Sequence, residues 1–462
     1  MHQYRANPPG SARLEQALMT GFVLDGYDPQ GFYCEMLRCA ATAALRQRLD
    51  HLPLADFQRR TAAAAQALYD YGITFTLYSE SSAIDRILPF DPIPRVLAAD
   101  EWRQIERGII QRVTALNLLL DDVYHGQKIL KDGVIPPDLI LGNPNYRPSM
   151  HGAAVAHKAY VNICVLRAFP DLVDGIGLRP VEDYGSRLVA AMREIAPASS
   201  SEPQIVLLSP GIYNSAYFEH VFLAREMGVP LVQGSDLVIE QDRVYMRTIA
   251  GLHAVDVIYR RINDDFLDPE AFRPDSLLGV PGLMRAYNAG NVALANAVGT
   301  GVADDKAVYA YVPKIIRYYL GEDAILQNVE THICREPNSL RYTLDHLAEL
   351  VVKPVGEAGG YGITIGPKAS RAELEECRAK LVADPANYIS QPCIDLSVAP
   401  TLCDGGVMPR HVDLRPFAIT GKSTWVLPGG LTRVALRPGS LMVNSSQGGG
   451  SKDTWVLEQG LE

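Results

Sequence analysis

Two features of one short stretch could together hold a phosphate group. Residues 350–366 read LVVKPVGEAGGYGITIG, an apolar run that ends at Lys353 and leads into a turn with Gly359, Gly360 and Gly362. Glycines let the backbone approach a ligand and donate N–H groups to phosphate oxygens, and a lysine ammonium adds a charge-assisted hydrogen bond. The lysine precedes the glycines, so the stretch is not a P-loop. A glycine-rich hairpin with an exposed lysine is the alternative.

Two further residues could contribute to the same nucleotide site. Lys306 follows two aspartates and opens a helical run in ADDKAVYAYVP, and Gln391 ends a short strand in YISQP. A glutamine at a strand end can bond the edge of a base. The alternatives are a solvated surface lysine and an ordinary boundary between strand and turn.

Two arginines are placed to grip one anion. Alternation along HVDLRPF puts Arg415 on one face of a predicted strand, and Arg433 lies on the next strand, in LTRVAL. The planar guanidinium fork suits phosphate or carboxylate. Unpaired surface arginines are the alternative.

Polar residues follow two predicted buried strands further upstream. Tyr213 and Asn214 follow the strand QIVLLSPG, and Arg260 ends the strand VDVIYRRI. Ligands of open α/β sheets bind at the carboxyl ends of the strands, so these residues are candidates for substrate binding. A structural ion pair is the alternative for Arg260. His220, in YFEHVF, is interpreted as a histidine packed within a helix.

Composition excludes several classes of protein. The 462 residues carry 43 Lys and Arg against 53 Asp and Glu, a net charge of −10, which argues against a general nucleic-acid binder. Seven cysteines without a CxxC pair are typical of reduced thiols in a cytoplasmic protein. We find no apolar run long enough for a membrane span, and no metal-binding or serine-nucleophile motif.

The N-terminal elements that position these residues can be predicted from periodicity. The pattern predicts a helical region over residues 31–70, a strand over 73–80 and a proline-stiffened connector over 89–97. Asp100 is the predicted N-cap of a long helix, in which apolar residues from 102 to 120 recur every three or four positions, as on a core-facing helix surface.

The rest of the chain reads as a mixture of helices and short strands. Residues 181–262 alternate helices with apolar strands, which predicts a βαβ unit with a parallel sheet. A helix over 370–383 is predicted to be capped by Ser370, and residues 411–436 are predicted to form a hairpin. The predicted fold class is therefore α+β with an α/β portion.

Taken together, these stretches resemble the ATP-grasp superfamily, and more closely its circularly permuted branch, which includes glutathionylspermidine synthetase-like proteins. The resemblance implies a Rossmann-like pre-ATP-grasp domain and a helical N-terminal region. It implies an N-terminal region over 1–150, a substrate domain over 151–285 and nucleotide-binding lobes over 286–462. The residues that carry it are Lys306, Lys353, Gly359, Gly360, Gly362, Gln391, Arg415 and Arg433.

The resemblance also implies roles and a reaction. Lys306 and Lys353 would hold ATP, residues 356–362 would cover its phosphates, and Gln391 would lie near the adenine. Arg415 and Arg433 would face the phosphoryl groups or an acyl-phosphate. The expected reaction uses ATP and Mg²⁺ to join a peptide-like or small carboxylate to an amine, which needs positioning and cationic stabilisation rather than a protein nucleophile.

The chain departs from the family pattern at the metal. The resemblance implies an acidic metal-binding segment near residues 160–170, but no acidic residue occurs from Ala153 to Phe169, so the metal ligands are unknown. Either this protein lacks the segment and binds or regulates without turnover, or the intact protein has a longer loop around Ile163 and Cys164 than this sequence shows.

Overall fold

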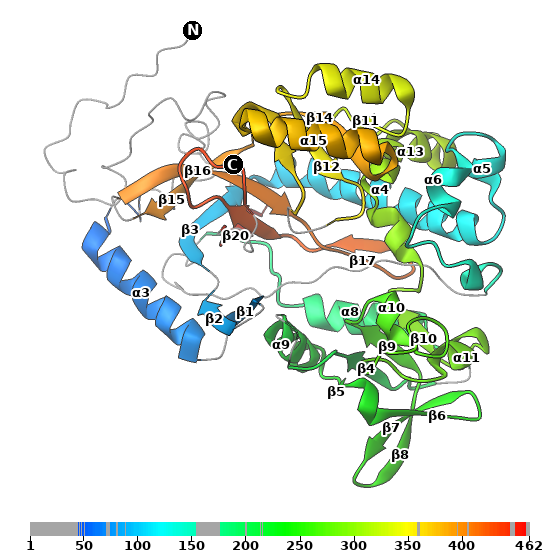
Figure 1. The fold of residues 1–462 in the computed structure, drawn as a ribbon. Coiled ribbons are helices and arrows are strands. Elements are labelled where there is room, and N and C mark those ends of the chain that lie inside the picture. The colour runs from blue at the N-terminus through cyan, green and yellow to red at the C-terminus, as the bar shows by residue number, and fades with distance from the viewer. Residues whose placement is uncertain are drawn as a thin grey trace, which may run out of the picture.

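A computed structural model of the chain is mixed α and β, which confirms the predicted fold class (Figure 1). None of the helices it describes is long and apolar enough to cross a membrane. The residues that it describes are 45, 47, 49, 51–70, 74–79, 82–87, 89–153, 176–198, 201–212, 214, 216–357, 361–394, 396–403, 406–443 and 449–458.

The predicted βαβ region forms a four-stranded parallel sheet, in the lower part of Figure 1. Leu207 and Tyr259 pack with Leu188 of a covering helix in one buried cluster. The sheet order is β10 (Ala293–Ala295), β9 (Val257–Arg260), β4 (Ile205–Leu208) and β5 (Leu231–Val232), with α8 (Tyr184–Glu194) and α9 (Tyr217–Met227) packed on it. The parallel sheet predicted for this region is confirmed.

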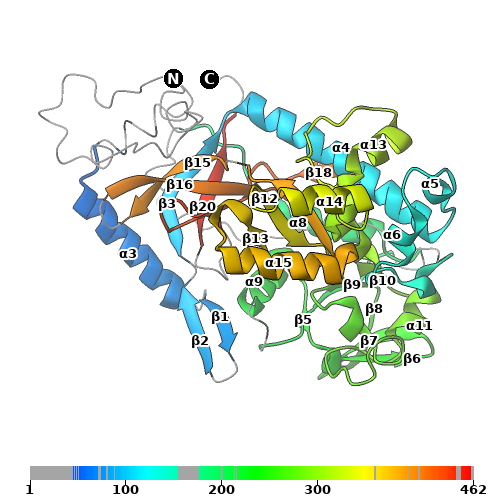
Figure 2. The ribbon, with the colours of Figure 1, turned by 45° about the horizontal axis from the view of Figure 1, so that its top comes forward.

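A smaller antiparallel sheet carries the lysine and glutamine strands. Its order is β11 (His332–Ile333), β14 (Tyr388–Pro392), β12 (Leu350–Pro354) and β13 (Thr364–Ile365). The helices α14 (Pro337–Asp345) and α15 (Arg371–Ala383) lie against it in Figures 1 and 2. Ser370 caps α15 in a capping box with Glu373, as predicted.

A five-stranded sheet carries the arginines. Its order is β15 (Val398–Cys403), β16 (Gly406–Arg415), β19 (Leu431–Val434), β20 (Gly450–Val456) and β3 (Phe90–Leu97). The two edge strands of this sheet, β15 and β3, also contact each other: the Leu402 backbone N–H of β15 donates a hydrogen bond to the Asp91 carboxylate of β3 at 2.9 Å. The antiparallel pairing of β16 with β19 confirms that Arg415 and Arg433 lie on adjacent strands.

The structure corrects two predictions. Residues 90–97 of the connector predicted over 89–97 form the edge strand β3, which is parallel to β20. Pro92 and Pro94 fall where that ladder shifts register, so their missing N–H groups break no regular pairing. The long helix α4 (Ala99–Tyr124) begins one residue before Asp100, and Ala98 is its N-cap.

The predicted core face of α4 is confirmed, since Trp102 and Leu120 are buried. The C-terminal part of the predicted helical region 31–70 is also helical, whereas residues 1–44 lie outside the described residues. The remaining elements are α3 (Leu54–Asp70), β1 (Thr74–Ser79), β2 (Ser82–Ile87), α5 (Lys128–Lys131), α6 (Pro137–Leu141), β6 (Leu237–Glu240), β7 (Arg243–Thr248), β8 (Gly251–Val255), α10 (Asp264–Leu267), α11 (Leu283–Asn288), α12 (Lys306–Ala310), α13 (Val312–Leu320), β17 (Ala418–Thr420) and β18 (Thr424–Val426).

Candidate nucleotide site

Lys306 and Lys353, from α12 and β12, lie close together. The Lys306 ammonium donates to the backbone carbonyls of Val355 at 3.3 Å and Glu357 at 2.5 Å. Burial lowers the pKa of both lysines, and the Lys306 charge lowers the pKa of Lys353 further. The two ammonium groups are therefore near enough to repel each other.

Gln391 joins this pair from the neighbouring strand β14. Its side-chain oxygen accepts a hydrogen bond from the Lys353 ammonium at 2.7 Å, and its amide donates to the Thr331 hydroxyl at 2.8 Å. The side chain is thus held by two partners in a fixed orientation. The structure brings Lys306, Lys353 and Gln391 together, as the sequence predicted, while a role for Gln391 at a base stays a prediction.

The turn after Lys353 needs a glycine at its far end. Gly362 has φ +69°, and a Cβ there would lie 2.9 Å from the Pro354 ring. A side chain at this position would therefore be strained and would collide with the strand that carries Lys353. Gly359 and Gly360 lie outside the described residues, so their predicted contact with phosphate stays a prediction.

Arg415 and Arg433 meet around one carboxylate. The Asp413 carboxylate accepts hydrogen bonds from the Arg415 guanidinium at 3.1 and 3.2 Å and from the Arg433 backbone N–H at 3.3 Å. The Arg433 Nε is buried without a hydrogen-bond partner. Burial lowers the pKa of Arg433, and the Arg415 charge lowers it further. The two arginines thus share contacts with the Asp413 carboxylate.

Sequence reasoning did not predict Glu219, an acidic residue near Arg433 on the helix α9 that packs on the parallel sheet. Glu219, on α9, lies near Arg433 and 4.0 Å from Arg261. Burial raises the pKa of Glu219, whereas the charges of Arg261 and Arg433 lower it. No local motif marks Glu219, because its partners are more than 40 positions away in the chain.

The predicted substrate residues are placed less favourably for a ligand. The Arg260 guanidinium donates to the carbonyls of Asn296, Ile262 and Ala297 and pairs with Asp264 at 2.6 Å. It therefore holds loops of the protein together, as in the structural alternative.

The structure gives no support for ligand binding by the other two substrate candidates, Asn214 and Tyr213. The Asn214 side chain accepts from the Ala216 N–H at 2.8 Å and so shapes its own turn. Tyr213 lies outside the described residues. A substrate role for Tyr213, Asn214 and Arg260 stays a prediction.

His220 is a packed histidine, as predicted. It is 2% exposed and lies 2.9 Å from the Ser209 hydroxyl at the end of β4. Burial, together with the nearby Arg261 charge, lowers its pKa to about 4. The imidazole is therefore neutral at neutral pH and serves the packing of α9 on the sheet.

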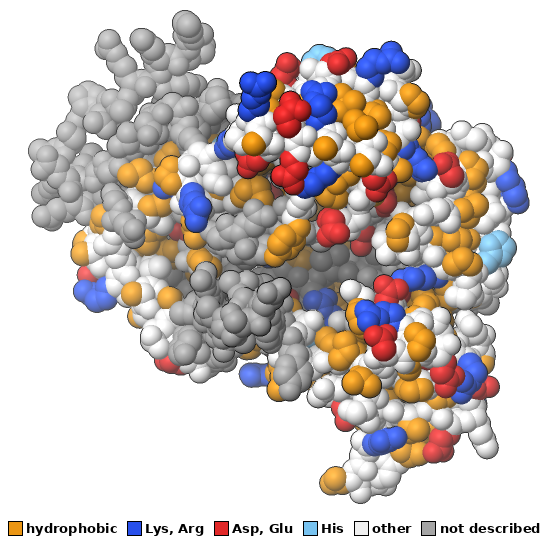
Figure 3. Space-filling model, in the orientation of Figure 1, with side chains coloured by type: hydrophobic (Ala, Val, Ile, Leu, Met, Phe, Trp, Pro, Cys, Tyr) orange, Lys and Arg blue, Asp and Glu red, His pale blue; other side chains and the backbone are white. Residues whose placement is uncertain are grey.

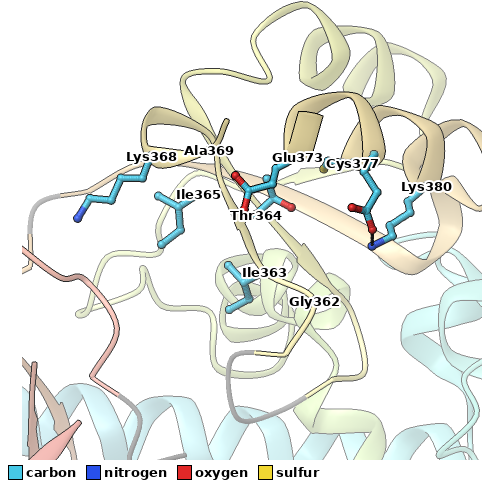
Figure 4. A pocket seen from close by; sticks show the side chains of 10 residues that line it. Gly362, Ile363, Thr364, Ile365, Lys368, Ala369, Glu373, Cys377 and Lys380 are labelled. Carbon is cyan, nitrogen blue, oxygen red and sulfur yellow. Dashed lines mark ion pairs between the residues drawn. The ribbon is translucent and has the colours of Figure 1, made fainter. Parts of the chain in front are cut away.

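The molecular surface is hollowed between the part that carries α14 and α15 and the part that carries α10 and α11, and charged side chains of both signs lie along the rim (Figure 3). A separate cavity of about 280 Å³ lies between β13 and α15, with the Glu376–Lys380 ion pair in its wall (Figure 4). Lys306, Lys353 and Gln391 do not line this cavity. Gly362, which belongs to the predicted nucleotide site, does line it, so the cavity adjoins the turn after Lys353 without containing the two lysines.

The residues fit an anionic nucleotide but not a protein-bound metal. The described part of the chain contains no group of three His, Cys, Asp or Glu side chains that could hold an ion. Asp305, the acidic residue beside Lys306, is already engaged, because its carboxylate accepts from the Ala307 and Val308 N–H groups and from Asn143. A magnesium site is thus not formed by these residues.

Comparison with known proteins places the chain in a family. A family described as circularly permuted ATP-grasp type 2 matches residues 94–166 and 163–435. An uncharacterized protein of Synechocystis is 47% identical over 479 residues, covering 94% of this chain and 99% of the relative. An uncharacterized protein of Mycobacterium tuberculosis is 47% identical over 437 residues, covering 87% of this chain and 79% of the relative.

A third relative bears a provisional functional name. A protein of Frankia alni, provisionally named a glutamate–cysteine ligase, is 39% identical over 499 residues, covering 97% of this chain and 57% of the relative.

The same comparisons show that this chain is shorter than its relatives at an internal position. The alignment with the Synechocystis protein spans 479 positions but covers 94% of a chain of 462 residues, so several tens of positions have no counterpart here. The two matched pieces of the family meet at residues 163–166. This is where the sequence lacks the expected acidic stretch.

Proposed function

Because the chain belongs to the circularly permuted ATP-grasp family, we propose that it binds ATP and joins a carboxylate to an amine. The observation that carries the proposal is the convergence of Lys306 and Lys353. These are two partly buried ammonium groups from different elements, and their hydrogen bonds go to neutral oxygens. Partly buried like charges raise the free energy of the empty site, and a bound polyphosphate would relieve that repulsion.

The proposed reaction has two steps. A carboxylate oxygen of the substrate attacks the γ-phosphorus of ATP, and ADP leaves. The amine then attacks the acyl carbon of the acyl-phosphate, phosphate leaves, and the amine loses a proton. In this proposal Arg433 and Arg415 stabilise the charge that builds up on the transferred phosphoryl group. The carboxylate donor is proposed to be peptide-like and to bind near Asn214 and Arg260.

Substitution of Lys353 tests the nucleotide site. Lys353→Met removes one charge-assisted hydrogen bond, worth about 1.5–3 kcal/mol, so ATP affinity should fall by about 10- to 100-fold. Titration calorimetry measures the change, and Lys314→Met, at an exposed position on α13, is the matched control. Equal ATP affinity in the Lys353 variant and the wild type would reject the assignment.

Phosphate release tests the reaction itself. The full chain is incubated with ATP, Mg²⁺ and pairs of candidate acids and amines, with glutathione and other small peptides as the first acids. Release that requires both an acid and an amine supports the ligase. Release in every mixture, or in none despite measured ATP binding, contradicts it.

A second function is favoured by one observation. The missing acidic stretch between Ala153 and Phe169 removes the residues that would hold the metal in the family. A protein that binds nucleotide without turnover, in a regulatory role, would be stabilised by ATP against heat equally with and without Mg²⁺ and would release no phosphate in the screen.

A further inference from the structure

Three of the four cationic groups of the candidate site form no ion pair with a described carboxylate. Carboxylates do lie near them, because against the lowering by burial the charges of Asp305, Glu357 and Asp304 raise the pKa of Lys306, and those of Asp413 and Glu219 raise the pKa of Arg433. Lys306, Lys353 and Arg433 form no ion pair with any described carboxylate, and only Arg415 is paired, with Asp413. The acceptors of the two lysines are the neutral oxygens of Val355, Glu357 and Gln391.

Two adjoining sheets supply these cations. The strand β14, with Gln391, leads through residues 393–397 directly into β15 of the arginine sheet. Lys368, in the loop after β13, donates a hydrogen bond to the Gly439 carbonyl in the loop after β19. Both ribbon views show the small sheet adjoining the five-stranded sheet (Figures 1 and 2). Lys353 and the two arginines therefore lie on adjoining sheets.

We infer that this chain neutralises the phosphates of its nucleotide with side-chain cations alone, so that its affinity for ATP does not depend on a divalent ion. The inference rests on the proposed nucleotide site and goes beyond it. It follows from the disagreement between the family and this chain, which lacks the acidic segment and whose described residues offer no metal cluster.

The electrostatics of the site support this inference. A protein-bound Mg²⁺ is held by carboxylates, which would themselves offset nearby lysines and arginines. Here the pKa values of Lys353 and Arg433 are lowered first by burial and then by a like charge beside each. An anion that brings no cation with it would satisfy these groups best.

Titration calorimetry with and without a divalent ion tests the inference. ATP is titrated into the full chain in excess EDTA and, separately, in excess Mg²⁺. We expect the two dissociation constants to agree within about threefold, or ATP to bind more tightly in EDTA, because the whole anionic charge is then available to the site. Binding that weakens by about tenfold or more in EDTA overturns the inference and leaves the nucleotide site standing. Absence of ATP binding in both conditions overturns the nucleotide site and the inference together.

Variants show which cations replace the metal. In EDTA, Lys306→Met, Lys353→Met and Arg433→Met should each weaken ATP binding by about 10-fold or more. Arg371→Met, on the exposed surface of α15, is the control and should bind like the wild type. Melting temperatures of all variants are compared, so that a folding defect is separated from a lost contact. Cation variants that bind ATP in EDTA like the control would overturn the inference.

Discussion

At Lys353 a charge and partial burial oppose each other. Its ammonium lies in a partly buried site beside a second ammonium, with a neutral amide oxygen as its partner. The lowered pKa means that the free protein loses this proton at a lower pH than an ordinary lysine does. A bound phosphate favours the charged form and so raises the pKa again.

Proton uptake on binding follows from this shift. In the pH range between the lowered pKa of the free protein and the higher pKa of the complex, Lys353 should take up a proton when ATP binds. ATP affinity should therefore decrease as pH rises through the free pKa. Calorimetry at about pH 9 in two buffers of different ionisation enthalpy measures the uptake. Lys353→Met should reduce the uptake, and equal proton uptake by variant and wild type would contradict the role of Lys353.

Among the elements, β20 contains a fully buried ion pair. Lys452 of β20 pairs with Asp91 of β3, and their side chains are 0% and 2% exposed. Burial lowers the pKa of Lys452 well below its ordinary value. Asp91 also accepts the backbone N–H of Leu402, so one carboxylate contacts both neighbouring strands, β20 and β15.

Removal of one partner should destabilise this sheet strongly. Lys452→Met leaves the Asp91 carboxylate buried without a counter-charge, and the free energy of unfolding should fall by about 3–5 kcal/mol. Adding Asp91→Asn should recover part of the loss, because an amide oxygen can still accept from Leu402. Denaturant unfolding measures both variants, with the exposed Lys422→Met as the control. A loss no larger than that of Lys422→Met would show that the pair does not support the sheet.

Local pattern was enough to predict many of these elements. Burial of QIVLLSPG, the Ser370 cap and a strand within HVDLRPF all depend on residues within a few positions of each other, and the structure confirms them. The strand β3 was not predicted, because prolines such as Pro92 and Pro94 usually argue against a strand. Only the pairing with β20 shows that they lie in an edge strand, at a shift of register. That partner, β20, is more than 350 positions away in the chain.

Pairings between distant segments also limited prediction of the site. The residues Lys306, Lys353 and Gln391 were proposed because each belongs to a stretch that resembles one family, and the structure shows that they lie close together. Glu219 was not predicted, because only its proximity to Arg433 and Arg261 makes it a candidate site residue. Both arginines lie on other elements, far from Glu219 in the sequence.

At the scale of the whole molecule, the sheet that carries the two arginines is built from segments far apart in the chain. The strand β3 begins at Phe90 and pairs with β20, which ends at Val456. Ser451 of β20 lies opposite Arg433 of β19 in the ladder, so the last described strand supports the arginine strand directly.

Truncation tests that dependence. A chain that ends at residue 449 lacks β20 and leaves both β3 and β19 without a partner strand on one side. It should lose cooperative thermal unfolding, as followed by circular dichroism. The control ends at residue 458, retains every described residue and should melt like the full chain. Cooperative melting of the shorter chain at the wild-type temperature would contradict the structural role of β20.

The parallel pairing of β3 with β20 also has a consequence for biosynthesis. The ribosome makes β3 more than 350 residues before β20, so β3 lacks its partner strand while that whole length of chain is synthesised. Long-range pairing of this kind is slow and leaves strand edges exposed to other chains meanwhile. A nascent chain cannot complete the sheet that holds Arg433 before residue 456 has emerged from the ribosome, so the surroundings of that arginine form only after β20 has been made.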